Sequence, residues 1–487
     1  MIYFRLIFVI LLSNILIINH AQELYYEQVA IIDSTDLPSD IIKKAAHLVP
    51  SARQAAWQEL EFTIFIHFGM NTFTGREWGE KGTSPVLFNP LELNARQWVE
   101  TARMAGARLL VLVAKHHDGF CLWPSKYTDY SVIKSPWNEG KGDVVAEVAK
   151  ACREAGVRLG IYLSPWDMNS PLYGTDAYND YFKNQLAELL SNYGEVDEVW
   201  FDGACGEGPN GRRQVYDWKG FYQIIRKLQP RAVIAVMGPD IRWVGTESGN
   251  GRETEWSVVP LPDSLAKEPD IRDQHAEIRN GVFIPPGNMM EQDLGSREKI
   301  IGAGTLIWYP SEVDVSIRPG WFYHPEQDSL VKSPDELVDI WYSSVGRNSV
   351  LLLNVPPDKR GLITEYDVSA LRGMKKILDE TFSNDLSGNG NLIKTDSSVI
   401  LYLPEPVTFD RIMIRENFRN GQRVEVFSIE IWREEGWIEI IHGTTIGYKR
   451  LLRVDPVQTS ALRLRIIKSR DQAEIRSFKL FKAPTGK

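Results

Sequence analysis

Residues 95–120 read ARQWVETARMAGARLLVLVAKHHDGF, a helix-like segment followed directly by an apolar, strand-like segment. In the first segment, apolar residues recur near helical spacing, and Gly106 stands where a helix would end. The second segment is apolar without interruption from Leu109 to Ala114, which is typical of a strand buried on both faces. A helix joined to such a strand predicts a parallel sheet that is covered by helices.

The same alternation continues between residues 60 and 355. Further helix-like segments end in glycine at 143–156 and 181–194. Apolar strand-like runs occur at residues 62–69, 108–120, 157–166, 196–204, 232–243, 305–310 and 349–357. Seven or eight such units predict an α/β fold, a (β/α)8-like TIM barrel. An open doubly wound sheet is the alternative, but its first turn would normally carry a GxGxxG motif, which HFGMNTFTG (67–75) is not.

After about residue 365 the pattern changes to alternating apolar and polar residues with period two, as in 397–417, 423–443 and 461–469. Turn residues separate these segments and no helical pattern interrupts them, which predicts a C-terminal antiparallel β-sandwich. The expected domains are a signal peptide at 1–21, a catalytic (β/α)8-like barrel at 22–360 and the β-sandwich at 361–487.

The N-terminal segment MIYFRLIFVILLSNILIINHA (1–21) places Arg5 before an apolar run and ends in the small residue Ala21. This is the form of a secretory signal peptide, so we expect an exported protein, periplasmic or secreted. A transmembrane anchor is the alternative. The run is shorter than about 20 apolar residues, and Ser13 and Asn14 interrupt it, which favours the signal peptide.

The composition narrows the class of partner. The 487 residues contain 55 Lys and Arg against 64 Asp and Glu, a net charge of −9, which argues against nucleic acid and against an anionic membrane surface after signal cleavage. Three cysteines suffice neither for a disulfide framework nor for a zinc motif. The 15 tryptophans are the unusual feature, because a flat apolar ring with one N–H donor suits the C–H faces of sugars.

Residues at the carboxyl ends of barrel strands line the active site of this fold. Histidine, tryptophan and carboxylate side chains recur at these predicted ends. The candidates are His67, Glu77, Trp78, His116, His117, Tyr162, Trp200, Asp202, Glu247, Glu253, Glu255, Arg318 and Trp321. A metal pair at His116 and His117 is one interpretation, but adjacent strand residues point to opposite faces, so we favour hydrogen bonding to sugar hydroxyls.

Glycoside hydrolysis would fit this set, because it needs two carboxyl groups across one glycosidic bond. Asp202 ends a predicted strand, and capping of the next helix is its alternative role. For the second carboxyl, Glu247 lies in a glycine-flanked loop, whereas Glu253 and Glu255 lie in a segment that resembles a strand. We favour Glu247 over Glu255, and expect burial against Trp243 or Trp256, together with Asp202, to raise its pKa.

Four blocks in order resemble the α-L-fucosidases of glycoside hydrolase family 29: IFIHFGMNTFTGREWG (64–79), AKHHDGFCLWPSKYTDYSV (114–132), GIYLSPWD (160–167) and VWFDGA (199–204). The resemblance covers residues 50–355. It implies a barrel followed by a β-sandwich, and a retaining double displacement that releases terminal α-L-fucose. It implies no metal and no other cofactor, and a fucosylated oligosaccharide or glycoprotein glycan as the partner.

The resemblance also implies roles for individual residues. Asp202 matches the nucleophile, and the fucose pocket matches His67, Glu77, Trp78, His116, His117, Tyr162 and Trp200. The block RWVGTESGNGRETEWSV (242–258) resembles the subgroup that cleaves α-1,3 and α-1,4 bonds in Lewis-type glycans, with Glu247 as the acid/base. Arg318 and Trp321 fall where later loops could reach the substrate. A broad-specificity fucosidase and an inactive secreted glycan-binding protein are the alternatives.

Overall fold

The structure, a computed structural model, describes residues 28–261, 277–279, 282–284 and 291–484. The expected signal peptide at 1–21 therefore lies outside the described residues. In the part of the chain that is described, no helix is both long and apolar enough to cross a membrane.

Eight parallel strands form the central sheet, in the order β6-β5-β4-β3-β2-β13-β12-β7. The strands are β2 (Phe62–Ile66), β3 (Leu109–Lys115), β4 (Arg158–Leu163), β5 (Glu198–Phe201), β6 (Val233–Val236), β7 (Arg242–Trp243), β12 (Ser311–Ser316) and β13 (Val350–Asn354). A single bridge between Ala235 and Ile241 links the two outer strands, β6 and β7. The sheet is therefore a nearly closed barrel, which confirms the predicted fold class.

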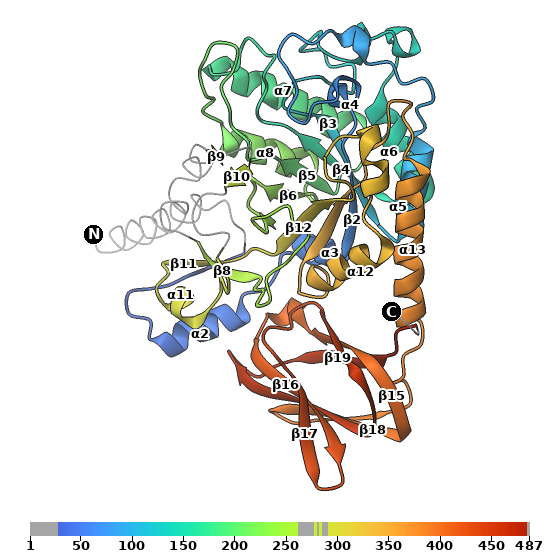
Figure 1. Cartoon of the computed structure of the whole chain (residues 1–487). Helices are drawn as coiled ribbons and strands as arrows, with labels where there is room; N and C mark the ends of the chain where they lie inside the picture. The colour runs from blue at the N-terminus through green and yellow to red at the C-terminus, as the bar shows by residue number, and fades with distance from the viewer. Residues whose placement is uncertain (1–27, 262–276, 280–281, 285–290, 485–487) are drawn as a thin grey trace, which may run out of the picture.

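Helices surround this sheet (Figure 1). They are α5 (Ala95–Ala105), α6 (Val144–Ala155), α7 (Asp176–Asn192), α8 (Trp218–Leu228), α12 (Pro334–Ser343) and α13 (Glu365–Phe382). Gly106 and Gly156 follow α5 and α6 in the left-handed conformation, with φ of 94° and 69°, as the glycine stop signals predict. The segment predicted at 181–194 is the later part of a longer helix, because α7 begins at Asp176.

Two of the predicted barrel strands are wrong. The run at 305–310 contains β11 (Thr305–Trp308), which pairs antiparallel with β1 (Val29–Ile31) and β8 (Val258–Leu261) in a separate sheet. The barrel strand is the next segment, β12, whose sequence SEVDVS alternates polar residues with valine. The run at 232–243 is two strands, β6 and β7, rather than one.

Short elements complete the chain outside the two large units. They are α2 (Pro38–His47), α3 (Ala52–Gln58), α4 (Met70–Thr74), α11 (Arg297–Ile301), β9 (Glu277–Arg279), β10 (Val282–Ile284) and the 3-10 turns η1 (Pro85–Leu87), η2 (Val132–Lys134), η3 (Trp137–Gly140), η4 (Pro325–Leu330) and η5 (Phe418–Asn420). The helix α2 packs on α11, beside the small β1-β11-β8 sheet.

The C-terminal strands form an antiparallel unit with its own core, as predicted (Figure 1, orange to red). They are β14 (Asn391–Lys394), β15 (Ser398–Glu416), β16 (Val424–Arg433), β17 (Gly436–Gly443), β18 (Arg450–Ser469) and β19 (Ile475–Phe481). Helix α13 lies before them and packs along α5 and α12, and its Leu371 and Met374 belong to the barrel core. The barrel core thus continues past the expected boundary at residue 360.

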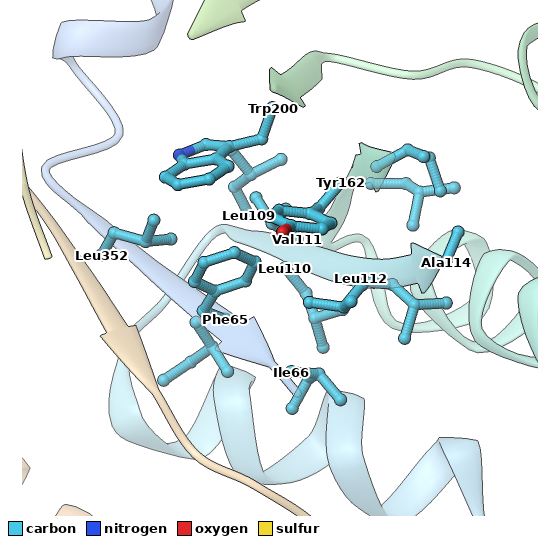
Figure 2. Close-up of a cluster of buried hydrophobic side chains, with 14 of the residues drawn as sticks. Phe65, Ile66, Leu109, Leu110, Val111, Leu112, Ala114, Tyr162, Trp200 and Leu352 are labelled. Atoms are coloured by element: carbon cyan, nitrogen blue, oxygen red, sulfur yellow. The ribbon is translucent and has the colours of Figure 1, made fainter. Parts of the chain in front are cut away.

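Aromatic side chains fill the barrel interior below the strand ends (Figure 2). Phe65, Tyr162 and Trp200 come from β2, β4 and β5, and their ring centroids lie 5.2–5.8 Å apart. Gly160 makes room at this level, because a Cβ there would stand 2.7 Å from Cγ2 of Val111. These packed aromatic rings form a rigid base beneath the carboxyl ends of the strands.

Candidate active site

A cavity of about 240 Å³ opens at the carboxyl ends of the barrel strands. It is lined by Phe65, His67, Glu77, Trp78, His116, His117, Tyr162, Trp200, Asp202, Glu247, Asp314, Pro319, Gly320 and Trp321. The structure therefore brings together every residue proposed from the sequence except Glu253, Glu255 and Arg318. The volume lies near the lower end for ligand pockets, which suits a single small ring better than an extended ligand.

Asp202 follows β5 directly and faces the cavity. Its Oδ2 accepts a hydrogen bond of 3.1 Å from the Tyr162 hydroxyl, and its Oδ1 accepts one of 2.7 Å from the backbone N–H of Ala204. Nε2 of His117 lies 3.9 Å from the same carboxyl. The helix-capping alternative is excluded, because α8 is capped by Asp217. Each carboxylate oxygen of Asp202 thus accepts one hydrogen bond, Oδ2 from Tyr162 and Oδ1 from Ala204.

Glu247 lies in the loop after β7, between two glycines in the left-handed conformation, Gly245 and Gly249 (φ 107° and 77°). The Trp321 indole N–H donates a 3.2 Å hydrogen bond to its Oε2. Burial raises the pKa of Glu247, the Trp321 hydrogen bond lowers it, and the charges of Asp202 and Glu77 raise it further. The net direction is upward, so this carboxyl keeps its proton to higher pH than an ordinary glutamate.

The tryptophans expected beside Glu247 have other partners. Trp243 donates its N–H to Asp314 at 2.6 Å, and Trp256 donates to Asp293 at 2.8 Å. Neither of these indole N–H groups therefore bonds to Glu247, and burial is the largest cause of the upward pKa shift. Trp321, from the loop after β12, is the tryptophan that contacts the carboxyl.

The other two glutamates after β7 point elsewhere. Glu255 is buried and bonds to the guanidinium groups of Arg242 and Arg252. Glu253 pairs with Arg347 at 2.7 Å and with Arg450. Neither lines the cavity, so of the three candidates only Glu247 faces the same space as Asp202.

Three histidines line one side of the cavity as neutral rings. Burial is the main cause that lowers the pKa of each of them, that of His67 to about 3. His67 Nδ1 lies 2.8 Å from Oδ1 of Asn354, whose amide nitrogen donates to the Trp321 carbonyl. His67 therefore donates through Nδ1–H and offers a lone pair at Nε2.

His117 is arranged in the same way as His67. Its Nδ1 lies 2.7 Å from Oγ of Ser164, and that hydroxyl donates onward to the carbonyl of Trp166 at 2.7 Å. Ser164 is therefore the acceptor, and His117 also offers its Nε2 lone pair to the cavity. His116 differs, because the Asn71 amide lies 3.4 Å from its Nδ1. Among the described residues no group of three or more His, Cys, Asp or Glu is placed to hold a metal.

Glu77 and Trp78 come from the loop after α4. Glu77 accepts hydrogen bonds from the backbone N–H of Trp321 at 2.8 Å and from His324 Nε2 at 2.7 Å. Gly320 allows this approach, since a Cβ there would stand 2.6 Å from Oε1 of Glu77. Trp78 stacks on the ring of His117, with centroids 5.3 Å apart and planes at 23°. Glu77 thus fixes the loop that carries Trp321.

Arg318 does not reach the cavity. It is 1% exposed, and its guanidinium bonds to Asp367 at 2.7 and 2.9 Å, to Asp328 at 2.9 Å and to Thr364 at 2.9 Å. These contacts join the loop after β12 to the start of α13. The expected substrate contact by Arg318 is contradicted, because its side chain does not line the cavity and four of its five N–H donors bond to the protein.

Phe65 and Asp314 line the cavity but were not predicted from the sequence. Phe65 stands two residues before His67 on β2, so strand alternation alone could have placed both on the interior face. Asp314 lies on β12, the strand that was mistaken for its neighbour at 305–310. The missed signal is the period-two spacing of Glu312, Asp314 and Ser316.

Comparison with known proteins agrees with this geometry. The sequence model of the Alpha-L-fucosidase family matches residues 33–381. Alpha-L-fucosidase 1 of Arabidopsis thaliana is 41% identical over 459 residues, which cover 87% of this chain and 85% of that protein. A crystal structure from Bacteroides ovatus superimposes with a TM-score of 0.87 at 48% identity, over 96% of this chain and 79% of the other.

A Ruminococcus gnavus fucosidase of family 29, crystallised in complex with fucose, superimposes with a TM-score of 0.77 at 27% identity, over 90% of this chain and 95% of that one. The family match covers both the barrel strands and the loops that build the cavity. This chain therefore belongs to the α-L-fucosidase family, glycoside hydrolase family 29, and is a glycoside hydrolase that acts on fucosides.

Proposed function

We propose that the enzyme is an exo-acting, retaining α-L-fucosidase, with Asp202 as the nucleophile and Glu247 as the acid/base. The observation that carries this proposal is that both carboxyls face one small cavity in different environments. Asp202 accepts hydrogen bonds from Tyr162 and Ala204, while burial and the charges of Asp202 and Glu77 raise the pKa of Glu247. A pair of carboxyls, one of which keeps its proton to higher pH, is what glycoside hydrolysis requires.

In the first step Asp202 attacks the anomeric carbon of fucose, the glycosidic bond breaks, and Glu247 gives its proton to the leaving oxygen. In the second step Glu247, now a carboxylate, takes a proton from water, and the resulting hydroxide displaces Asp202 and releases L-fucose. Neutral His67, His116 and His117 supply hydrogen-bond partners for the sugar hydroxyls, and Trp78 and Trp321 supply apolar contact.

The proposed substrates are α-1,3- and α-1,4-fucosylated glycans of the Lewis type, carried on oligosaccharides or glycoproteins. The support is the position of Glu247 in the block RWVGTE (242–247), on a loop that lies at the cavity wall. A broad-specificity fucosidase and an inactive glycan-binding protein are the competing functions. The intact pair of carboxyls favours catalysis over binding alone.

The test is release of L-fucose from a panel of α-1,2, α-1,3, α-1,4 and α-1,6 fucosides, with and without a neighbouring galactose branch. We expect rapid release from the α-1,3- and α-1,4-linked Lewis trisaccharides and slow release from the rest. Equal rates across the panel would indicate broad specificity. Binding without release by the wild-type protein would indicate a glycan-binding function.

Asp202→Asn tests the nucleophile on an aryl α-L-fucoside, where we expect activity to be lost while the protein stays folded. Near-wild-type turnover would remove the assignment. Export is a separate proposal that rests on residues 1–21. Amino-terminal sequencing of the mature protein should then begin near Gln22, and a mature protein that starts at Met1 would contradict it.

A further inference from the structure

Besides Glu77, Asp202 and Glu247, the cavity is lined by a fourth carboxyl, Asp314, for which the proposed mechanism gives no task. Asp314 lies on β12, two residues after Glu312, so both side chains point to the barrel interior. Glu312 accepts the N–H of Trp200 at 2.8 Å, and Asp314 accepts the N–H of Trp243 at 2.6 Å. Asp314 is 3% exposed and lines the cavity together with Asp202 and Glu247.

The surroundings of Asp314 oppose a negative charge. Asp202 faces it from the end of β5, Glu247 from the loop after β7, and Glu312 from its own strand. Trp243 on β7 is a neutral donor, and within the described ranges no Lys, Arg or His forms an ion pair with Asp314. Burial is the largest cause that raises the pKa of Asp314, and the charges of Glu247 and Asp202 raise it further, against the Trp243 hydrogen bond.

The hydrogen-bond pattern assigns the proton to one oxygen. Oδ1 accepts the Trp243 N–H, so a proton on the carboxyl belongs on Oδ2. The side chain lines the cavity. The O–H of a neutral Asp314 therefore lies within reach of the space that a sugar would occupy.

We propose that Asp314 is a substrate-contact residue that works as a neutral carboxylic acid, its Oδ2–H donating a hydrogen bond to an oxygen of the bound sugar. The inference rests on the proposed function, since the sugar is the fucosyl ring between Asp202 and Glu247. It complements the histidines, because His67 and His117 offer lone pairs and sugar hydroxyls need acceptors and donors together. A carboxylate at this position would instead add a third negative charge to the cavity.

Two substitutions that keep the branched outline of the side chain separate the neutral acid from a carboxylate. Asp314→Asn keeps an acceptor for Trp243 and a donor toward the sugar, and we expect kcat/KM for an aryl α-L-fucoside within about threefold of wild type. Asp314→Leu removes both, and we expect a loss of about 10- to 100-fold, with weaker inhibition by L-fucose. Trp243→Phe removes the partner of Oδ1 but leaves Oδ2–H, so its loss should be smaller than that of Asp314→Leu.

Three kinetic results would overturn the proposal. Loss of activity in Asp314→Asn as complete as in Asp202→Asn would show that the negative charge is required. Activity of Asp314→Leu within threefold of wild type would show that Asp314 does not contact the sugar. A loss in Trp243→Phe equal to that in Asp314→Leu would assign the effect to packing of the indole.

Infrared difference spectroscopy tests the protonation state without turnover, and also serves if Asp314→Leu does not fold. The spectrum of wild type minus Asp314→Asn at neutral pH should contain a protonated-carboxyl band that shifts when L-fucose is added. Subtraction removes the bands of the buried Glu198 and Glu312. If the enzyme hydrolyses fucosides but the band is absent, or does not shift when L-fucose is added, the inference about Asp314 is refuted and the proposed function stands. If the enzyme hydrolyses no fucoside, the proposed function itself is refuted.

Discussion

The indole N–H of Trp321 donates a 3.2 Å hydrogen bond to Oε2 of Glu247, and the backbone N–H of Trp321 donates to Glu77 at 2.8 Å. One residue thus connects two acids that are 170 positions apart in the sequence and that both line the cavity. The loop after β12 therefore bonds through Trp321 to the glutamate that we propose as the acid/base.

Trp321→Phe should move the alkaline limb of the kcat/KM profile to higher pH. The N–H stabilises the carboxylate of Glu247 and lowers its pKa, so removal of this donor lets Glu247 keep its proton longer as the pH rises. The measurement is the pH dependence of aryl α-L-fucoside hydrolysis. A limb that moves to lower pH, or stays in place, would contradict the assignment of Glu247 as the acid.

Tyr162→Phe should reduce kcat/KM by about 10- to 100-fold, because it removes one of the two hydrogen bonds to the Asp202 carboxylate while the ring still packs on Trp200. Tyr178→Phe is the matched control, since its buried hydroxyl donates to the carbonyl of Pro165, outside the cavity. The control should lower the melting temperature without a comparable loss of kcat/KM. Equal kinetic losses would point to packing rather than to the nucleophile.

Glu247→Ala should slow hydrolysis of glycans by about 100- to 10,000-fold, but slow aryl fucosides with good leaving groups much less, because a good leaving group needs no proton. Azide should restore turnover and yield an α-fucosyl azide, because it attacks the intermediate on Asp202 from the face that the leaving group occupied. Glu255→Ala is the control: it leaves Arg242 and Arg252 buried without their carboxylate, so it should lose stability. Azide rescue of Glu255→Ala instead would reverse the assignment.

Arg318→Met should destabilise the fold by about 3–5 kcal/mol, because it leaves Asp367 buried without its partner. The folded fraction should keep the wild-type KM for an aryl fucoside, since the guanidinium does not line the cavity. Thermal unfolding and steady-state kinetics check the two parts separately, and Asp367→Asn should lower stability in the same way. A raised KM with unchanged stability would restore Arg318 as a substrate contact.

Glu198→Gln should make the enzyme more stable at alkaline pH relative to wild type. Burial is the largest cause that raises the pKa values of Glu198 and Glu312, which lie close to each other inside the barrel. As the pH rises above the ordinary value of 4.5, the unfolded chain loses these protons first, so the wild-type unfolding free energy falls. Melting temperatures at pH 5 and pH 8 should differ less in the variant. Each kcal/mol corresponds to about 2–4 °C in a domain of about 150–250 residues and to less in a larger chain.

Much of the fold was predictable because local signals and tertiary structure agree. Continuous apolar runs marked β2, β3, β4, β5 and β13, and the glycines after α5 and α6 ended those helices where expected. The β12 strand was missed because its interior positions are acids. A segment in which acids alternate with apolar residues resembles a solvent-exposed strand. Inside the barrel, the indole N–H groups of Trp200 and Trp243 donate hydrogen bonds to these acids, which compensates for their burial.

The sequence by itself determined the barrel, the C-terminal sandwich and most of the cavity, since parallel strands bring their carboxyl ends to one rim. Tertiary structure alone decided between chemically equivalent side chains. Glu247 faces the cavity while Glu255 pairs with two arginines, and Trp321 reaches the acid while Arg318 turns to α13. A residue type states what a side chain can bind, but its neighbours, brought together from distant loops, decide which partner it meets.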